Sequence, residues 1–165
     1  MKLKNRHYLR SNEIKTLKNE IKQKFGEKSI EIIFNKKPKI EIAKIENMFT
    51  VYIFDNEFIL FRINQELVPS LKAIIDGKFD LPKIIVDSGA VKYILNGADI
   101  MRPGVVHIDD NIEKDSYVKI IEEKYQRPIS IGLSLYDSDI MKQMKTGKII
   151  KNIHYINDKI WKSLY

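Results

Sequence analysis

Apolar residues recur at helical spacing near the start of the chain. Ile14, Leu17, Ile21 and Phe25 stand three or four residues apart and form one narrow stripe. This stripe predicts a helix over residues 11–25, with Ser11 as its N-cap and Gly26 closing it. The opposite face of that helix carries lysines.

Short runs rich in Ile, Phe, Val and Tyr follow this helix and predict β-strands. In the first half they cover residues 30–34, 39–45, 50–54 and 58–63. Asp55–Asn56 separates the last two runs as a turn, which indicates a hairpin. Pro69 opens a predicted short helix through Ile75, and Gly77 ends it. The polar and Gly/Pro-containing stretch 76–82 then reads as a linker, with a domain boundary near residue 80.

The second half alternates many short strands with two short helices. Asp87 or Ser88 caps the first helix, which buries an apolar face and stops at Gly97. That face comprises Ala90, Val91, Ile94 and Leu95. The second helix covers residues 137–145 and stops at Gly147. The strands are predicted at residues 83–86, 99–101, 105–108, 117–122, 129–135 and 148–155, with Pro103–Gly104 as a turn. This spacing favours a compact, partly closed β-barrel whose last strand returns beside its first.

Composition excludes several classes of chemistry. The 165-residue chain has 44% hydrophobic and 31% charged residues, and no apolar run could span a bilayer. Its polar, basic start lacks the apolar stretch of a signal peptide, so we expect a cytoplasmic protein. The absence of cysteine excludes thiol catalysis and Cys-ligated zinc. His7, His107 and His154 lie far apart without metal-ligand spacing. We therefore expect no metal, no cofactor and no catalytic residue.

The net charge of +7 is concentrated at the amino end. Residues 1–44 carry 13 Lys and Arg against 5 Asp and Glu, whereas the remainder of the chain is nearly neutral. Clustered positive charge favours phosphate backbones or anionic membrane surfaces. The alternative is that the basic face is only solvated, or reflects a heat-adapted or AT-biased source. The residues of this secondary basic face are Lys15, Lys18, Lys22 and Lys24.

One longer segment resembles a known family. Residues 86–104 (VDSGAVKYILNGADIMRPG) are similar to the signature of PUA domains, the small RNA-binding modules of pseudouridine synthases and archaeosine transglycosylases. The similarity continues through residues 129–133 (ISIGL). Residues 152–158 (NIHYIND) and Trp161 resemble one subgroup, the malignant T-cell-amplified-sequence and ligatin family with its archaeal relatives. Residues 58–62 (FILFR) and 68–71 (VPSL) resemble the pre-PUA domain of that subgroup.

The resemblance implies an α+β fold in two domains. Residues 1–80 would form an α/β pre-PUA domain, and residues 81–165 a PUA pseudo-β-barrel with two short helices. It also implies a non-catalytic adaptor on rRNA or tRNA, acting in initiation, reinitiation or recycling. Its partners would be the small ribosomal subunit, the tRNA acceptor end and a protein with a SUI-type domain. Two alternatives stay open: an accessory RNA-binding subunit of a tRNA- or rRNA-modifying enzyme, and a protein-interaction scaffold.

Carried over residue by residue, the PUA pattern marks seven positions for RNA contact. They are Gly89, Lys92, Tyr93 and Asn96 on the first helix, Arg102 after the short strand, and Lys148 and Lys151 on the last strand. The cations would pair with phosphates and Tyr93 would stack on a base, although Tyr93 could instead be a half-buried packing residue. Gly89, without a Cβ, would let a phosphate or ribose approach main-chain N–H groups, the alternative being that it serves turn geometry alone. Lys92 and Arg102 are expected to be exposed. His154, near Asp158, is interpreted as structural, and Trp161 as a cap on the barrel end.

Overall fold

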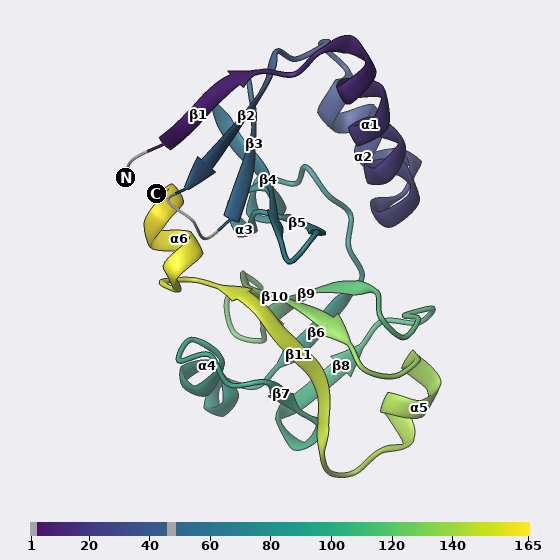
Figure 1. Cartoon of the computed structure of the whole chain (residues 1–165). Helices are drawn as coiled ribbons and strands as arrows, with labels where there is room; N and C mark the ends of the chain where they lie inside the picture. The colour runs from purple at the N-terminus through teal and green to yellow at the C-terminus, as the bar shows by residue number, and fades with distance from the viewer. Residues whose placement is uncertain (1–2, 46–48) are drawn as a thin grey trace. The chain divides into compact units, whose positions relative to one another are not determined.

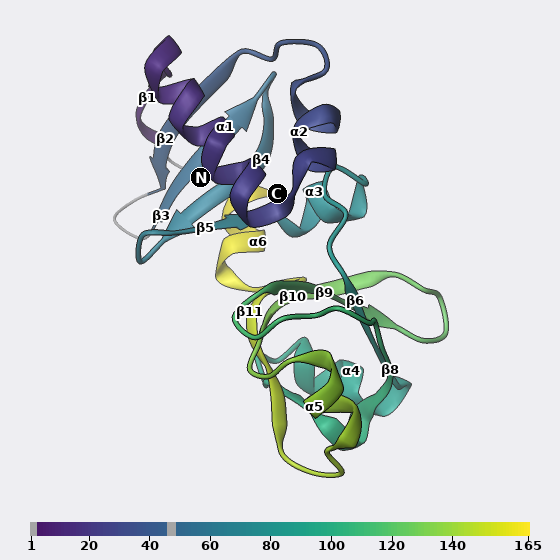
Figure 2. The same cartoon turned by 90° about the vertical axis from the view of Figure 1, so that its right-hand side faces the viewer.

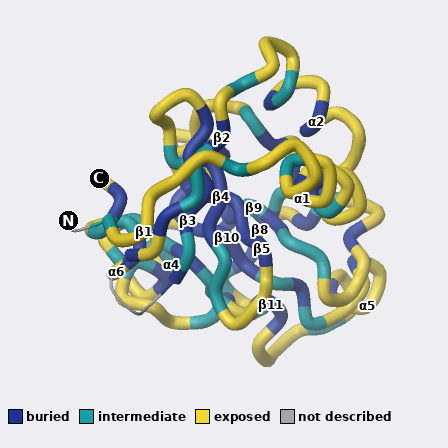
Figure 3. The backbone as a smooth tube through the Cα atoms, turned by 45° about the horizontal axis from the view of Figure 1, so that its top comes forward, coloured by how far each residue is buried: buried dark blue, intermediate teal, exposed yellow. Residues whose placement is uncertain are grey.

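A computed structural model describes residues 3–45 and 49–165. The chain divides into two compact units, Met1–Asp80 with Leu164, and Leu81–Ser163 with Tyr165. We call them the N-terminal and the C-terminal unit. Both combine helices with mainly antiparallel strands, which confirms the α+β class. Figure 3 shows that the buried backbone is concentrated in the strands, while α1 and α5 are largely exposed.

The N-terminal unit is a meander covered by two helices. Its five strands are β1 (Leu3–Tyr8), β2 (Ile40–Ile45), β3 (Phe49–Phe54), β4 (Glu57–Ile63) and β5 (Glu66–Pro69), each antiparallel to the next. Helices α1 (Ser11–Phe25) and α2 (Glu27–Phe34) lie on one face of this sheet (Figures 1 and 2). The short α3 (Leu71–Ile75) follows β5. Leu17, Ile21 and Phe25 of α1 are buried, as the predicted stripe requires.

Several details of this unit differ from the sequence prediction. Residues 30–34 are the end of helix α2 and not a strand, because Ile30 and Ile33 stand at helical spacing and are both buried. Arg10, not Ser11, is the N-cap of α1, and its N–H donates to the Glu13 carboxylate (2.7 Å). Pro69 ends β5, while Ser70 caps α3 by accepting a bond from the N–H of Ala73 (3.1 Å). Strands β1 and β5 were not predicted.

The C-terminal unit is built on one six-stranded sheet. Its strands are β6 (Lys83–Val86), β7 (Ile100–Met101), β8 (Val105–Ile108), β9 (Tyr117–Glu122), β10 (Pro128–Ser134) and β11 (Lys148–Tyr155). Helices α4 (Ser88–Ile94) and α5 (Ser138–Gln143) lie between them, and α6 (Lys159–Leu164) ends the chain. The core beneath α4 includes Ile84, Ile94 and Ile150. Helix α6 was not predicted, so three helices and not two follow residue 80 among the described residues.

The strand order makes this sheet a nearly closed barrel. The order is β7-β11-β10-β9-β6-β8, and the two edge strands are joined by a single 3-10 turn, η1 (Arg102–Gly104). The expected pairing of the last strand with the first is wrong. Strand β11 lies between β7 and β10, because β6 is occupied by β8 on one side and by a parallel β9 on the other.

Candidate nucleic-acid interface

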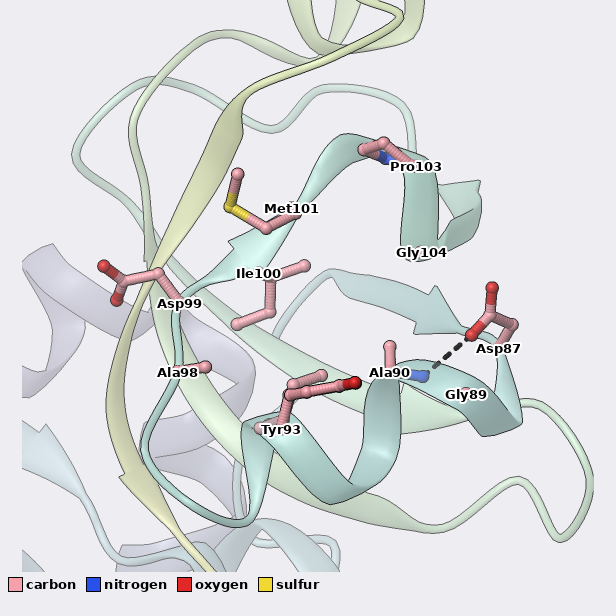
Figure 4. Close-up of a pocket in the computed structure, with 11 residues that line it drawn as sticks. Asp87, Gly89, Ala90, Tyr93, Ala98, Asp99, Ile100, Met101, Pro103 and Gly104 are labelled. Atoms are coloured by element: carbon pink, nitrogen blue, oxygen red, sulfur yellow. Dashed lines mark hydrogen bonds between the residues drawn. The ribbon is translucent and has the colours of Figure 1, made fainter.

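A groove of about 470 Å³ opens in the C-terminal unit between α4 and the β7–η1 segment. Figure 4 shows Ala90 and Tyr93 on its helical side and Ile100 and Met101 on its strand side. Apolar groups dominate the lining, and Met101 is half exposed. The lining residues are Asp87, Gly89, Ala90, Tyr93, Ile94, Ala98, Asp99, Ile100, Met101, Pro103 and Gly104.

Local chain geometry keeps this groove open. Strand β6 ends at Val86, and the Asp87 carboxylate caps α4 by accepting a bond from the N–H of Ala90 (2.9 Å). Gly97 then adopts φ +91°, a left-handed conformation that turns the chain back toward β7. Gly104 faces the helix so closely that a Cβ there would lie 3.0 Å from the Ala90 Cβ. Small residues therefore set the separation of α4 and η1.

The start of α4 differs from the phosphate cradle expected at Gly89. The Ala90 N–H is bonded to Asp87, and the Ser88 N–H donates to the Glu123 carboxylate (3.1 Å). Two main-chain donors expected to receive a phosphate are thus occupied by carboxylates, which also place negative charge there. Gly89 itself is exposed and lines the groove. The position permits close approach of a ligand, but the Ser88 and Ala90 N–H groups on either side are already bonded to carboxylates.

Lys92, Tyr93 and Asn96 are exposed, as the helical periodicity predicts. Tyr93 keeps 59% of its surface exposed, so it is not the half-buried packing residue of the alternative interpretation. The Lys92 Nζ lies 5.3 Å from the centre of the Tyr93 ring, within cation–π distance. Only Tyr93 of these three lines the groove. The outer face of α4 therefore offers an aromatic surface beside a positive charge.

Arg102 is held by the protein, and the expectation of an exposed guanidinium is wrong. Its Nε donates to the main-chain carbonyl of Met141 (2.8 Å) and its Nη1 to that of Val105 (3.1 Å). The side chain is only partly accessible. Arg102 therefore joins η1 to helix α5. The short strand β7 cannot bury the guanidinium, but α5 lies close enough to supply a carbonyl acceptor.

The two lysines of β11 stand at different positions relative to the groove. Lys148 pairs in register with Met101 of β7, and its Nζ bonds to Asp99 (3.0 Å). Asp99 also accepts the N–H of Asn152 (2.8 Å), so this groove-lining carboxylate fixes the Lys148 ammonium at the rim. Lys151 is exposed further along β11.

Several groove residues were missed by sequence reasoning. Ile100, Met101 and Pro103 supply most of the strand-side wall, and the available sequence signal was a methionine two residues before a Pro–Gly pair. Asn152 is a further omission. Its Nδ2 donates to the carbonyls of Ile94 and Ala98 (3.0 Å each), which ties the end of α4 to β11. These bonds join residues more than fifty positions apart, so no local pattern in the sequence could have revealed them.

His154 and Asp158 join β11 to α6. His154 is fully buried, with its Nδ1 2.8 Å from Asp158, while Asp158 also accepts the N–H groups of Tyr155 (3.0 Å) and Trp161 (2.6 Å). Burial would raise the pKa of the Asp158 carboxyl. The hydrogen bond and charge of His154, with the two main-chain donors, outweigh it and hold that pKa below its ordinary value. This location supports the structural interpretation of His154.

The secondary basic face of α1 is exposed but partly neutralised. Lys22 bonds to Glu27 and Lys24 to Glu66, both at 2.5 Å. Lys18 lies over the Phe34 ring at 5.3 Å. Lys15 makes no hydrogen bond or ion pair with the described residues. Surface pairs of this kind are weak, so the lysines stay available to a polyanion.

Among residues 3–45 and 49–165, no three His, Asp or Glu side chains gather closely enough to hold a metal ion. Within the same ranges, the helices are too short or too polar to cross a membrane.

Comparison with known proteins places both halves in described families. The Pre-PUA-like domain family matches residues 1–76, and the PUA domain family matches residues 82–156. The chain is therefore a two-domain PUA protein, and its groove lies within the PUA segment.

Relatives cover almost the whole chain. An uncharacterised protein of Methanocaldococcus jannaschii is 36% identical over 161 residues, 98% of each chain. Translation machinery-associated protein 20 of Schizosaccharomyces pombe is 34% identical over 140 residues, 82% of this chain and 77% of its own. A crystal structure of a hypothetical protein from Pyrococcus horikoshii superposes with a TM-score of 0.84 at 32% identity, covering 97% and 99% of the two chains. The chain belongs to the family that includes translation machinery-associated protein 20 and malignant T-cell-amplified sequence 1.

Proposed function

We propose that this protein is an RNA-binding adaptor of the translation machinery, with its primary RNA site in the groove of the C-terminal unit. The observation that carries the proposal is the apolar groove bordered by the exposed Tyr93 ring, with Lys92 beside that ring and Lys148 bonded to the groove-lining Asp99. Support for a role in translation comes from relatives whose names associate them with the translation machinery.

The groove suits an unpaired nucleotide better than a duplex. Proteins bind single strands by stacking bases on aromatic side chains and tracking the phosphates with cations. Tyr93 offers such a ring, and Met101 and Ile100 offer an apolar wall opposite it. Lys148 at the rim and Lys92 above the ring lie where a backbone would pass. A carboxylate pair at the start of α4 disfavours phosphate there, so the groove would receive a base and not a phosphate.

An RNA with a single-stranded end or loop is therefore the proposed ligand, either rRNA or tRNA. The unpaired 3′ end of tRNA meets this requirement, and the small ribosomal subunit offers exposed loops. The basic N-terminal unit would add sequence-independent attraction to RNA, which places the adaptor on a large RNA surface. A protein with a SUI-type domain remains the proposed partner in translation.

Binding measurements on two tRNA forms test the proposal. The protein should bind an intact tRNA more tightly than one whose unpaired 3′ nucleotides have been removed. Tyr93→Ala should weaken binding of the intact form by about 5- to 150-fold. Tyr136→Ala, which removes another partly exposed tyrosine of the same unit, serves as the matched control and should bind like the parent. Equal affinity of the Tyr93→Ala variant and the parent would contradict the groove as the site.

A nuclease-treated pull-down separates the adaptor from its two alternatives. Recovery of rRNA or tRNA fragments supports the adaptor. Recovery of one RNA-modifying enzyme in stoichiometric amount would indicate an accessory subunit, and recovery of a protein partner without RNA would indicate a scaffold.

A further inference from the structure

The turn between β9 and β10 exposes a second aromatic ring beside cations. Residues 124–127, here called the hairpin tip, are Lys124, Tyr125, Gln126 and Arg127, and all four are exposed. Tyr125 keeps 65% of its surface exposed, and the Lys124 Nζ lies 5.0 Å from the centre of its ring. Lys92 and Tyr93 on α4 form the same kind of pair.

The acidic residues before the tip are used within the protein. Glu122 is buried, with 8% of its surface exposed, and its carboxylate accepts the N–H groups of Lys124 (2.9 Å) and Tyr125 (2.5 Å). Glu123 accepts the Ser88 N–H at 3.1 Å. The carboxylates are thus engaged by main-chain donors while the two cations of the tip face solvent. Residues 122–127 carry no net formal charge, but the two charged side chains of the tip itself, Lys124 and Arg127, are both positive and exposed.

Hydrogen bonds of Glu123, the residue before the tip, tie this turn to the start of α4. The Glu123 N–H donates to the Val86 carbonyl (3.0 Å), and the Ser88 hydroxyl lies 3.4 Å from the Glu123 carboxylate. Ser88 is the first residue of α4, and its neighbours Asp87 and Gly89 line the groove. Tyr93 lies at the other end of this helix, about 7.5 Å further along its axis at 1.5 Å per residue. The Lys92–Tyr93 pair thus lies toward the end of α4, and the turn that carries the Lys124–Tyr125 pair is bonded to the start of α4 through Glu123.

We propose that the hairpin tip is a second contact for the same RNA strand, with Tyr125 stacking on a base and Lys124 and Arg127 neutralising phosphates. The strand would pass from the groove to the tip with its phosphates turned away from the Asp87 and Glu123 carboxylates at the start of α4. This inference rests on the proposed function, because it takes a single-stranded RNA as the occupant. A ring flanked by cations suits that ligand. Protein interfaces, in contrast, bury larger apolar cores, and the tip has one large apolar ring.

The experiment measures the affinity of a 12-nucleotide single-stranded RNA at several salt concentrations. Tyr125→Ala should weaken binding by about 5- to 150-fold, whereas Tyr125→Phe, which keeps the ring, should bind like the parent. Lys124→Gln with Arg127→Gln should reduce the slope of log affinity against log salt by about 1.4, at roughly 0.7 for each phosphate that is no longer neutralised. Lys114→Gln with Lys159→Gln removes equal charge from exposed positions outside the tip and should leave that slope unchanged.

The variants separate failure of this inference from failure of the proposed function. If Tyr93→Ala weakens binding and the tip variants do not, the groove is an RNA site and the tip is not part of it. If the parent does not bind single-stranded RNA, both are overturned. If the tip variants weaken binding and Tyr93→Ala does not, the tip and the groove do not bind one strand, and the inference is overturned. The changed side chains are exposed, so each variant should have the same thermal unfolding midpoint as the parent. An unchanged midpoint shows that a loss of binding is not caused by misfolding.

Discussion

Arg102 is expected to matter more for stability than for RNA contact. Its guanidinium donates to the carbonyls of Met141 and Val105, which join η1 to α5. Hydrogen bonds to a charged group contribute about 1.5 to 3 kcal/mol each. Since the side chain is only partly buried, water replaces some of the loss in Arg102→Ala. We therefore expect the free energy of unfolding to fall by about 3 kcal/mol, the lower end for two bonds.

Urea and thermal unfolding followed by circular dichroism measure this loss. A fall of about 3 kcal/mol corresponds to a midpoint roughly 12 to 24 °C lower for a unit of this size. Arg102→Lys keeps the charge but cannot bond to both carbonyls. Its free energy of unfolding should therefore lie between those of the parent and of Arg102→Ala. Arg127→Ala, which truncates an exposed arginine of the same unit, is the matched control and should change stability by less than about 0.5 kcal/mol. An Arg102→Ala protein that unfolds within about 2 °C of the parent, roughly 0.5 kcal/mol or less, would refute the assigned bonds.

Three further outcomes follow from the structure. Gly132→Ala should lower the free energy of unfolding by about 1 to 3 kcal/mol in urea titration, because the new Cβ would lie 2.2 Å from the Ile150 Cγ2; a stability equal to the parent's would contradict that packing. The folded-state pKa of Asp158 is depressed. Its contribution to the free energy of unfolding is therefore present above the unfolded-state pKa of 3.8 and is lost as pH falls below that value. Asp158→Asn should reduce the loss of stability in acid, measured as the free energy of unfolding against pH. The same pH dependence in the variant and the parent would show that another group causes the loss. Replacing the four lysines of the secondary basic face with Gln should lower the salt slope by about 0.7 to 0.9 for each phosphate that those lysines neutralise, and an unchanged slope would show that the face is only solvated.

The elements with strong local patterns were predictable from the sequence. Strands at residues 117–122 and 148–155 and the helix at 11–25 have the predicted bounds. Residues 30–34 were misassigned because a short apolar run fits either a buried strand or a helix. Strand β1 was missed because its residues 4–8 are exposed, so it lacks an apolar alternation.

The candidate site was only partly predictable. The resemblance to PUA domains located α4, and helical periodicity correctly placed Lys92 and Tyr93 on its outer surface. Periodicity could not show that Arg102 bonds to a carbonyl 39 residues away, or that Glu123 occupies the Ser88 amide 35 residues away. These hydrogen bonds depend on how the turn after β9 lies against α4 and how α5 lies against η1. For the same reason, the strand-side wall of the groove was visible only in the structure.

The central claim, that the groove of the C-terminal unit binds single-stranded RNA, is tested most directly by NMR. Titration of the ¹⁵N-labelled chain with a 12-nucleotide single-stranded RNA reports which main-chain amides change environment. We predict that the largest shifts lie at groove residues, with Gly89, Tyr93 and Met101 among them, and that Tyr93→Ala weakens the response. Saturable RNA binding with shifts confined to residues outside the groove would contradict this claim.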